Sequence, residues 1–117
     1  MADILVVDDE ASMRFLLRTT LEVAGHHVVE APDGMAAAER IEGGRLPDLV
    51  ATDFMMPRMN GGELIARLRR DPATSDLPII LVSSSPGSEN RTAADMFFRK
   101  PFDPQELTEC VAKLLAR

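Results

Sequence analysis

Short apolar runs alternate with longer amphipathic stretches along the whole chain. Five apolar runs have the length of buried strands, and they cover residues 3–7, 26–31, 48–53, 77–85 and 96–100. Apolar residues recur at helical spacing in four stretches, which are residues 13–25, 33–44, 61–71 and 103–117. Because strands and helices alternate, crossovers must join the strands. The pattern therefore predicts an α/β fold, a doubly wound parallel sheet with helices on both faces.

Residues that typically begin or end helices lie at the boundaries of these stretches. Gly25 and Gly43 follow the first two helices, and Pro72 ends the third. Asp103 is suited to cap the last helix, with Pro104 at its first position. These residues support the helix boundaries that the apolar pattern predicts.

Polar residues follow four of the predicted strands at the point where each strand ends. Asp8 and Asp9 follow the first strand, Asp53 ends the third, Ser83 the fourth and Lys100 the fifth. In an open parallel sheet the ligand lies beyond the carboxyl ends of the strands. We therefore expect these five side chains to meet at one edge of the sheet.

Three carboxylates at one edge repel one another unless a cation lies between them, and carboxylate oxygens are ligands that Mg²⁺ prefers. The Lys100 ammonium and the Ser83 hydroxyl suit phosphoryl oxygens. Asp53 is the best candidate nucleophile, because it precedes the loop at residues 54–62, which contains the turn-forming residues proline and glycine. The sequence therefore predicts Mg²⁺-dependent phosphoryl chemistry.

Composition narrows the class of protein. The 117 residues suit a single domain, so we expect one unit over residues 1–117. A net charge of −6 argues against direct nucleic-acid binding by this domain. The single cysteine, Cys110, fits a reducing compartment, and neither a signal peptide nor a transmembrane segment is recognised. We expect a soluble cytoplasmic protein without membrane contact.

Four motifs occur in an order that resembles the response-regulator receiver domain of two-component signalling: "ILVVDDE", "DLVATDFMMPRMNGGEL", "PIILVSSS" and "FFRKPF". The resemblance spans nearly the whole chain and favours a stand-alone, single-domain type. It implies a flavodoxin-like sheet of five parallel strands in the order 2-1-3-4-5. It also implies a phosphorelay protein that is not an enzyme on other substrates, catalysing only its own phosphoryl transfer and dephosphorylation.

The resemblance assigns the metal and the phosphoacceptor. Asp53 would accept a phosphoryl group from a phosphohistidine on a histidine kinase or a histidine phosphotransferase. Asp8, Asp9 and Asp53, together with the main-chain carbonyl of Met55, would hold Mg²⁺. The protein that receives the signal is not identified by the sequence.

The resemblance also assigns the switch. Lys100 would contact the phosphoryl group, and the Lys100–Pro101 peptide bond would be cis. Ser83 would move inward on phosphorylation, and Phe97 occupies the position of the aromatic switch residue. The added phosphate carries about −1.5 to −2 charges, which is enough to draw a hydroxyl and an ammonium into new hydrogen bonds.

The segment between Ser83 and Lys100 is shorter than in most receivers, where it holds the fourth helix. Pro86 and Gly87 disfavour a helix in its first part, so only residues 88–94 could form a turn or two. The sequence therefore predicts a shortened or irregular fourth helix. Many receivers contact their downstream partner through that helix, so the resemblance does not identify the surface through which this chain passes on its signal.

Other readings remain beside the receiver. A pseudo-receiver that binds partners without phosphorylation is kept as the alternative. A dehalogenase-type phosphatase requires an acid where the chain has Met55, and no GxxxxGK[ST] phosphate loop is present. The arginines at 67, 69 and 70 are expected to form a solvated helix face.

Overall fold

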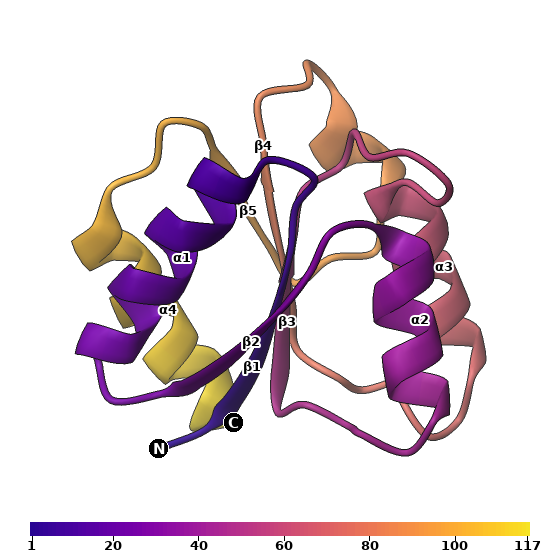
Figure 1. Ribbon diagram of the computed structural model, residues 1–117, viewed down its shortest axis with the longest axis horizontal. Coiled ribbons are helices and arrows are strands. Elements are labelled where there is room, and N and C mark those ends of the chain that lie inside the picture. Colours follow the sequence, from indigo (N-terminus) through magenta and orange to yellow (C-terminus); the bar gives the residue numbers. More distant parts are fainter.

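The computed structural model describes residues 1–117, apart from the side chains of Glu89 and Arg91. Its five strands form one parallel sheet in the order β2-β1-β3-β4-β5 (Figure 1). The strands are β1 (Asp3–Val7), β2 (His27–Ala31), β3 (Leu49–Thr52), β4 (Ile79–Ser83) and β5 (Met96–Arg99). The predicted fold class and strand order are confirmed.

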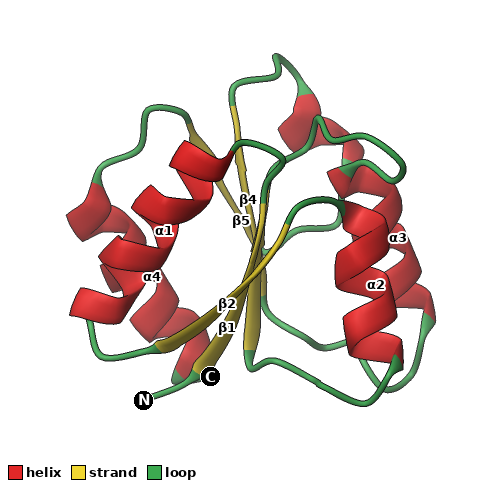
Figure 2. Cartoon of the chain, in the orientation of Figure 1, coloured by secondary structure: helices red, strands yellow, loops and turns green.

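Four α-helices cover the two faces of the sheet. They are α1 (Ala11–Val23), α2 (Gly34–Glu42), α3 (Gly61–Arg70) and α4 (Pro104–Leu115). Helices α1 and α4 lie against one face, and α2 and α3 lie against the other (Figure 2). Within the described chain no helix combines the length and apolarity needed to cross a bilayer.

Each face of the sheet carries its own hydrophobic core. Side chains alternate along a strand, so Leu5 and Val7 of β1 pack beneath α2 and α3, whereas Ile4 and Val6 pack beneath α1 and α4. All four are at most 1% exposed. The continuous apolar runs of the sequence therefore reflect strands buried on both faces.

The connection between β4 and β5 contains one short 3₁₀-helix, η1 (Ser88–Arg91), where receivers usually have their fourth helix. Gly87 precedes η1 with a φ of 77°, a left-handed conformation that glycine adopts readily. The predicted shortening of this helix is confirmed. Because η1 is not an α-helix, the helix after β5 is labelled α4 here.

Helix termini agree with the sequence in part. The Asp103 carboxylate accepts a hydrogen bond from the main-chain N–H of Gln105, so it caps α4 as predicted. Helix α3 begins with a capping box in which the side chain of Asn60 and that of Glu63 each accept from the other's N–H, at 2.8 and 3.0 Å. The motif analysis did not identify this box.

The solvated arginine face predicted for α3 is wrong for Arg69. Its side chain is 20% exposed, forms an ion pair with Asp95 at 3.0 Å and donates to the main-chain carbonyl of Leu77 at 2.7 Å. It also donates to the carbonyl of Ala93. The loops before β4 and before β5 both fold back against α3, so the guanidinium bonds main-chain carbonyls instead of water.

Candidate functional site

The carboxyl ends of β1 and β3 bring three carboxylates together at the upper edge of the sheet in Figure 1. Oxygen atoms of Asp8, Asp9 and Asp53 lie within 4.8 Å of one another. Asp8 and Asp53 are 0% and 7% exposed, whereas Asp9 is exposed. Two of the three like charges are therefore held away from water, which is unfavourable without a nearby cation.

Lys100, which follows β5, supplies the protein's own positive charge at this edge. Its Nζ lies 2.9 Å from Oδ2 of Asp8 and 3.4 Å from Oδ2 of Asp53, and its side chain is 11% exposed. Burial lowers the pKa of the Lys100 ammonium, but the hydrogen bonds and charges of the two carboxylates outweigh that effect, so its pKa is raised. Lys100 is therefore protonated at neutral pH.

Asp53 is destabilised as an anion by its surroundings. Burial and the charge of Asp8 raise the pKa of the Asp53 carboxyl, and these effects outweigh the opposing effect of Lys100. Its Oδ1 accepts a hydrogen bond from the main-chain N–H of Phe54 at 2.8 Å. One ammonium thus serves two buried carboxylates, so the site has room for further positive charge.

The loop after Asp53 is held in place by close main-chain contacts. The N–H of Gly61 donates to the carbonyl of Phe54 at 2.7 Å, and a Cβ at Gly61 would collide with the carbonyl oxygen of Asp53. Arg58 has a φ of 66°, and its guanidinium bridges both carboxylate oxygens of Asp33 at 3.0 and 3.2 Å. The loop therefore fixes the main chain on which Asp53 is carried.

The hydroxyl of Ser83, at the end of β4, forms a hydrogen bond with the connection that leads to β5. Its Oγ accepts from the N–H of Ser85 at 3.0 Å, and the side chain is buried. The carbonyl of Ser85 in turn accepts from the hydroxyl of Ser88 at 2.9 Å. The carbonyl of Ser83 accepts from the N–H of Lys100 at 3.1 Å, and the following Lys100–Pro101 bond is cis.

Met55 and Phe97 lie outside the cluster of acidic side chains. The side chain of Met55 is exposed, and its main chain belongs to the loop directly after Asp53. Phe97 is partly buried against the core beneath α2 and α3, whereas the neighbouring Phe98 packs against the opposite core. Adjacent residues of β5 thus contact different layers of the protein.

Arg14 of α1 also contacts the site, and the sequence motifs did not single it out. Its Nη1 donates to the main-chain carbonyl of Asp8 at 2.7 Å, and its Nε donates to Glu30 of β2 at 3.1 Å. The signal available in the sequence is an arginine one helical turn after the acidic residues. A side chain that bonds main-chain atoms cannot be recognised from that spacing alone.

The three clustered carboxylates fit a hard divalent cation. Carboxylate and carbonyl oxygens suit Mg²⁺, which commonly keeps several waters and bridges a few protein ligands to a phosphoryl group. The carboxylates of Asp8, Asp9 and Asp53 are close enough to share one ion. Mg²⁺ is thus compatible with the donor set.

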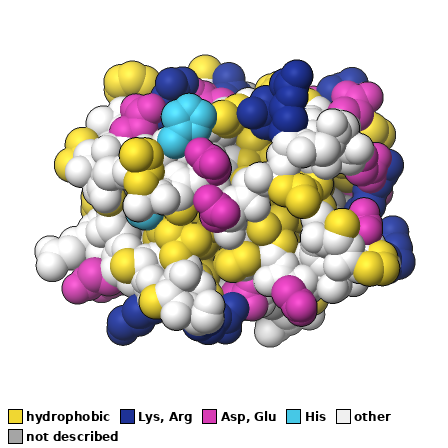
Figure 3. Space-filling view, turned by 90° about the horizontal axis from the view of Figure 1, so that it is seen from below, with side chains coloured by type: hydrophobic (Ala, Val, Ile, Leu, Met, Phe, Trp, Pro, Cys, Tyr) yellow, Lys and Arg dark blue, Asp and Glu magenta, His cyan; other side chains and the backbone are white. Residues whose placement is uncertain are grey.

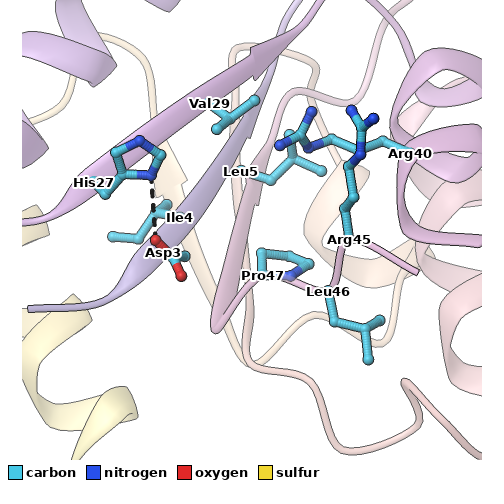
Figure 4. Close-up of a pocket in the computed structure, with 9 residues that line it drawn as sticks. All are labelled: Asp3, Ile4, Leu5, His27, Val29, Arg40, Arg45, Leu46 and Pro47. Atoms are coloured by element: carbon cyan, nitrogen blue, oxygen red, sulfur yellow. Dashed lines mark ion pairs between the residues drawn. The ribbon is translucent and has the colours of Figure 1, made fainter. Parts of the chain in front are cut away.

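A cavity of about 250 Å³ lies at the opposite edge of the sheet, near the amino ends of β1 and β2. Arg40 and Arg45 line one side, and the ion pair of His27 with Asp3 lies on the other (Figure 4). Viewed from this edge, apolar side chains gather near the centre of the surface, with charged side chains around them (Figure 3). The acidic cluster is at the far end of the strands, so this cavity is separate from it.

Comparison with known sequences gives one consistent result. The sequence profile described as "Response regulator receiver domain" matches residues 4–112. The phosphate regulon transcriptional regulatory protein PhoB of Pseudomonas aeruginosa is 38% identical over 119 residues, covering 97% of this chain and 52% of PhoB. The transcriptional regulator RpaA of Synechocystis is 34% identical, with 100% and 50% coverage. The chain thus spans about half the length of these curated relatives.

Solved structures that resemble this chain are also response regulators. A putative response regulator from Chloroflexus aurantiacus superposes with a TM-score of 0.93 at 32% identity, covering 99% of this chain and 98% of that one. The chemotaxis response regulator CheY4 of Vibrio cholerae gives a TM-score of 0.86 at 29% identity, with 97% and 98% coverage. The comparisons of sequence and of fold therefore agree with each other.

Proposed function

This chain belongs to the response regulator receiver domain family, and from that premise we propose that Asp53 accepts a phosphoryl group. The donor is a phosphohistidine on a histidine kinase or histidine phosphotransferase, and the reaction depends on Mg²⁺. The phosphorylated domain then signals through contacts with another protein, in the cytoplasm. Its catalysis is limited to its own phosphoryl transfer and the later hydrolysis of the acyl phosphate.

The observation that carries this proposal is the position of Asp53 beside a second buried carboxylate and an ammonium that contacts both. Lys100 lies within 3.4 Å of Asp53 and within 2.9 Å of Asp8, so a phosphoryl group on Asp53 would be next to a protonated lysine. Positive charge beside the transferred group stabilises the charge that spreads over its oxygens. Mg²⁺, when bound by Asp8, Asp9, Asp53 and the Met55 carbonyl, supplies further positive charge.

The transfer is a single displacement at phosphorus. An oxygen of the Asp53 carboxylate attacks the phosphorus, the bond from phosphorus to the histidine nitrogen breaks, and its electron pair remains on that nitrogen. The hydrogen bond from the Phe54 N–H holds one carboxylate oxygen in place. Hydrolysis later returns inorganic phosphate and the free carboxylate.

The switch follows from the hydrogen bonds of Ser83. Its hydroxyl oxygen accepts from the N–H of Ser85 in the unphosphorylated domain. Once Asp53 is phosphorylated, a phosphoryl oxygen offers the hydroxyl proton a charged acceptor, which binds it more strongly than a neutral one. Turning Ser83 toward the phosphoryl group alters its bond to Ser85 and hence the position of η1. Phe97 packs beside β4 and takes up the change of space there.

The test is phosphorylation by acetyl phosphate with and without Mg²⁺, followed by intact-mass analysis. We expect a labile adduct of one phosphoryl group that requires Mg²⁺ and disappears in Asp53→Asn. An Asp76→Asn variant, changed at an exposed carboxylate outside the acidic cluster, should still be labelled. A wild-type protein that gains no adduct would contradict the proposal and favour the phosphorylation-independent interaction module.

A further inference from the structure

We propose that Arg14 is a positioning residue that holds the acidic loop after β1 in the geometry needed for Mg²⁺. This inference rests on the proposed function, because it concerns the same site. It assigns to α1 a part in the reaction that the acidic motif does not include.

Arg14 joins three elements of the fold at one point. From α1, its Nη1 donates to the carbonyl oxygen of Asp8 at 2.7 Å and its Nε donates to Glu30 of β2 at 3.1 Å. The side chain is 19% exposed, so water competes little for these bonds. Hydrogen bonds from a charged donor are short and about twice as strong as neutral ones. Arg14 therefore fixes the main chain of Asp8 relative to both α1 and β2.

The N–H of Asp8 also donates to the carbonyl of Ala31 at 3.2 Å, which ties the loop to β2 but not to α1. In the described part of the chain, the N-cap residue of α1, Glu10, makes no side-chain cap hydrogen bond. The N–H of Glu10 instead donates to Oδ1 of Asp8 at 2.9 Å. That oxygen belongs to a carboxylate that the proposed function gives to Mg²⁺. Part of the loop is thus held by a carboxylate that would also serve the cation.

Lys100 cannot replace Arg14 in this role. Lys100 holds Asp8 through the carboxylate oxygen Oδ2, and a phosphoryl group on Asp53 offers that ammonium a competing partner. Arg14 bonds the main-chain oxygen, which takes no part in the ligand set. Its contact can therefore stay the same in the empty, metal-bound and phosphorylated site.

Charge alone would have the opposite effect. A guanidinium close to the acidic cluster repels a divalent cation, so removing its charge would by itself strengthen Mg²⁺ binding. Positioning predicts weaker binding instead, and it predicts weaker binding even when the charge is kept. Arg14→Lys keeps the charge but lacks the planar, fixed fork that bridges two acceptors.

Arg18 provides a matched control. It lies one helical turn further along α1 and its Nη1 bonds the same Glu30, at 2.9 Å. Its Nε also pairs with Glu22 at 3.0 Å, and within the described side chains it makes no bond to Asp8. Arg18→Lys therefore disturbs the contacts of Glu30 but leaves the hydrogen bond from Arg14 to the Asp8 carbonyl in place.

The experiment is a Mg²⁺ titration of wild type, Arg14→Lys, Arg14→Met and Arg18→Lys, followed by NMR amide shifts. NMR is preferred because the chain has no Trp or Tyr to report by fluorescence. Loss of an outer partner of a metal ligand typically weakens binding 10–100-fold, and we expect about tenfold for both Arg14 variants because a main-chain atom is released. Arg18→Lys should bind as the wild type does. Thermal melts without Mg²⁺ establish that each variant is folded.

Each outcome decides the inference. Weaker binding by Arg14→Lys, with unchanged binding by Arg18→Lys, supports it. Equal losses at positions 14 and 18 would assign the effect to Glu30 and overturn it, as would unchanged or tighter binding in both Arg14 variants. If Arg14→Met does not fold, Arg14→Lys decides alone. A wild type that binds no Mg²⁺ contradicts the proposed function itself, so the two failures are distinguishable.

Discussion

Replacing Asp53 by asparagine should stabilise the ion-free domain at neutral pH, although it removes the proposed phosphoacceptor. Asparagine keeps the oxygen that accepts from the N–H of Phe54, so the substitution changes the charge more than the hydrogen bonding. The ionised carboxylate is disfavoured by burial and by Asp8, and favoured by Lys100. The sign of the effect depends on which of these is larger.

The distances between the charged groups give the free-energy cost of ionising Asp53. Carboxylate oxygens within 4.8 Å repel by about 3.5 kcal/mol or more at an effective dielectric constant of about 20. Lys100, 3.4 Å away, attracts Asp53 by about 5 kcal/mol on the same basis. Desolvation of a carboxylate adds a penalty of several kcal/mol, about 3 for a side chain that keeps one hydrogen bond. The ionised form is then unfavourable by about 1–2 kcal/mol, in agreement with the raised pKa.

The effect has a defined pH dependence. A carboxyl whose pKa is raised by folding contributes stability below its unfolded pKa, and that contribution is lost as the pH rises through the folded pKa. The wild type therefore loses this contribution on approach to neutral pH, and Asp53→Asn does not. The advantage of the variant should be largest at neutral pH and should disappear in acid, where the wild-type carboxyl is protonated.

The assay is urea unfolding followed by circular dichroism, with a chelator present, from neutral pH into the acid range. We expect the free energy of unfolding of Asp53→Asn to exceed that of the wild type by about 1–2 kcal/mol at neutral pH. Added Mg²⁺ should reduce the difference, because a bound cation stabilises the carboxylate.

Asp33→Asn is the matched control. Asp33 is 6% exposed, close to the 7% of Asp53, but its hydrogen bond from Arg58 lowers the pKa of its carboxyl despite burial. The same substitution should therefore destabilise the fold at neutral pH, with the loss vanishing as the pH falls through the lowered pKa of Asp33. If both variants shift stability in the same direction, or if the gain in Asp53→Asn does not depend on pH, the electrostatic reasoning is refuted.

Three further substitutions test the site and its support, and a fourth, at Arg70, is a control. Lys100→Met should cost about 3 kcal/mol in urea unfolding, because it leaves buried carboxylates without a counter-charge, and Mg²⁺ should recover part of the loss; an unchanged free energy would contradict this. Gly61→Ala should cost about 1–3 kcal/mol and slow labelling by acetyl phosphate, since the added methyl meets the Asp53 carbonyl; normal stability and labelling would show that the loop adapts. Arg69→Met should cost about 3 kcal/mol and speed amide exchange at residues 93–96, whereas the exposed Arg70→Met should change stability by less than about 0.5 kcal/mol. Equal effects at positions 69 and 70 would contradict the role of Arg69.

The sheet and the acidic site could be predicted because each depends on a short-range pattern. Apolar runs of strand length predict where the strands lie in the sequence. A parallel sheet brings the carboxyl ends of its strands to one edge, whatever the conformation of the connecting loops. Asp8, Asp53 and Lys100, though far apart in sequence, follow from that rule. The shortened helix could be predicted because Pro86 and Gly87 act locally.

Contacts that depend on how loops fold back could not be predicted in the same way. The arginine cluster at 67, 69 and 70 predicts a solvated helix face, whereas the partners of Arg69 lie in two loops whose course the pattern does not determine. Arg14 bonds a main-chain carbonyl, and every residue carries one, so no sequence signal marks the acceptor. Side chains that bond main-chain atoms are therefore the part of this site that required the structure.

The connection between β4 and β5 is short for a crossover between parallel strands. Parallel strands need a crossover of about a dozen residues or more, and residues 84–95 provide no more than that. If β5, and not the loop, took up a deletion of one residue there, β5 would shift by one position against β4 and each of its side chains would face the opposite layer. Phe97 and Phe98 would exchange cores, and Lys100 would point away from the carboxylates. The charge balance among Asp8, Asp53 and Lys100 thus depends on the register between β4 and β5.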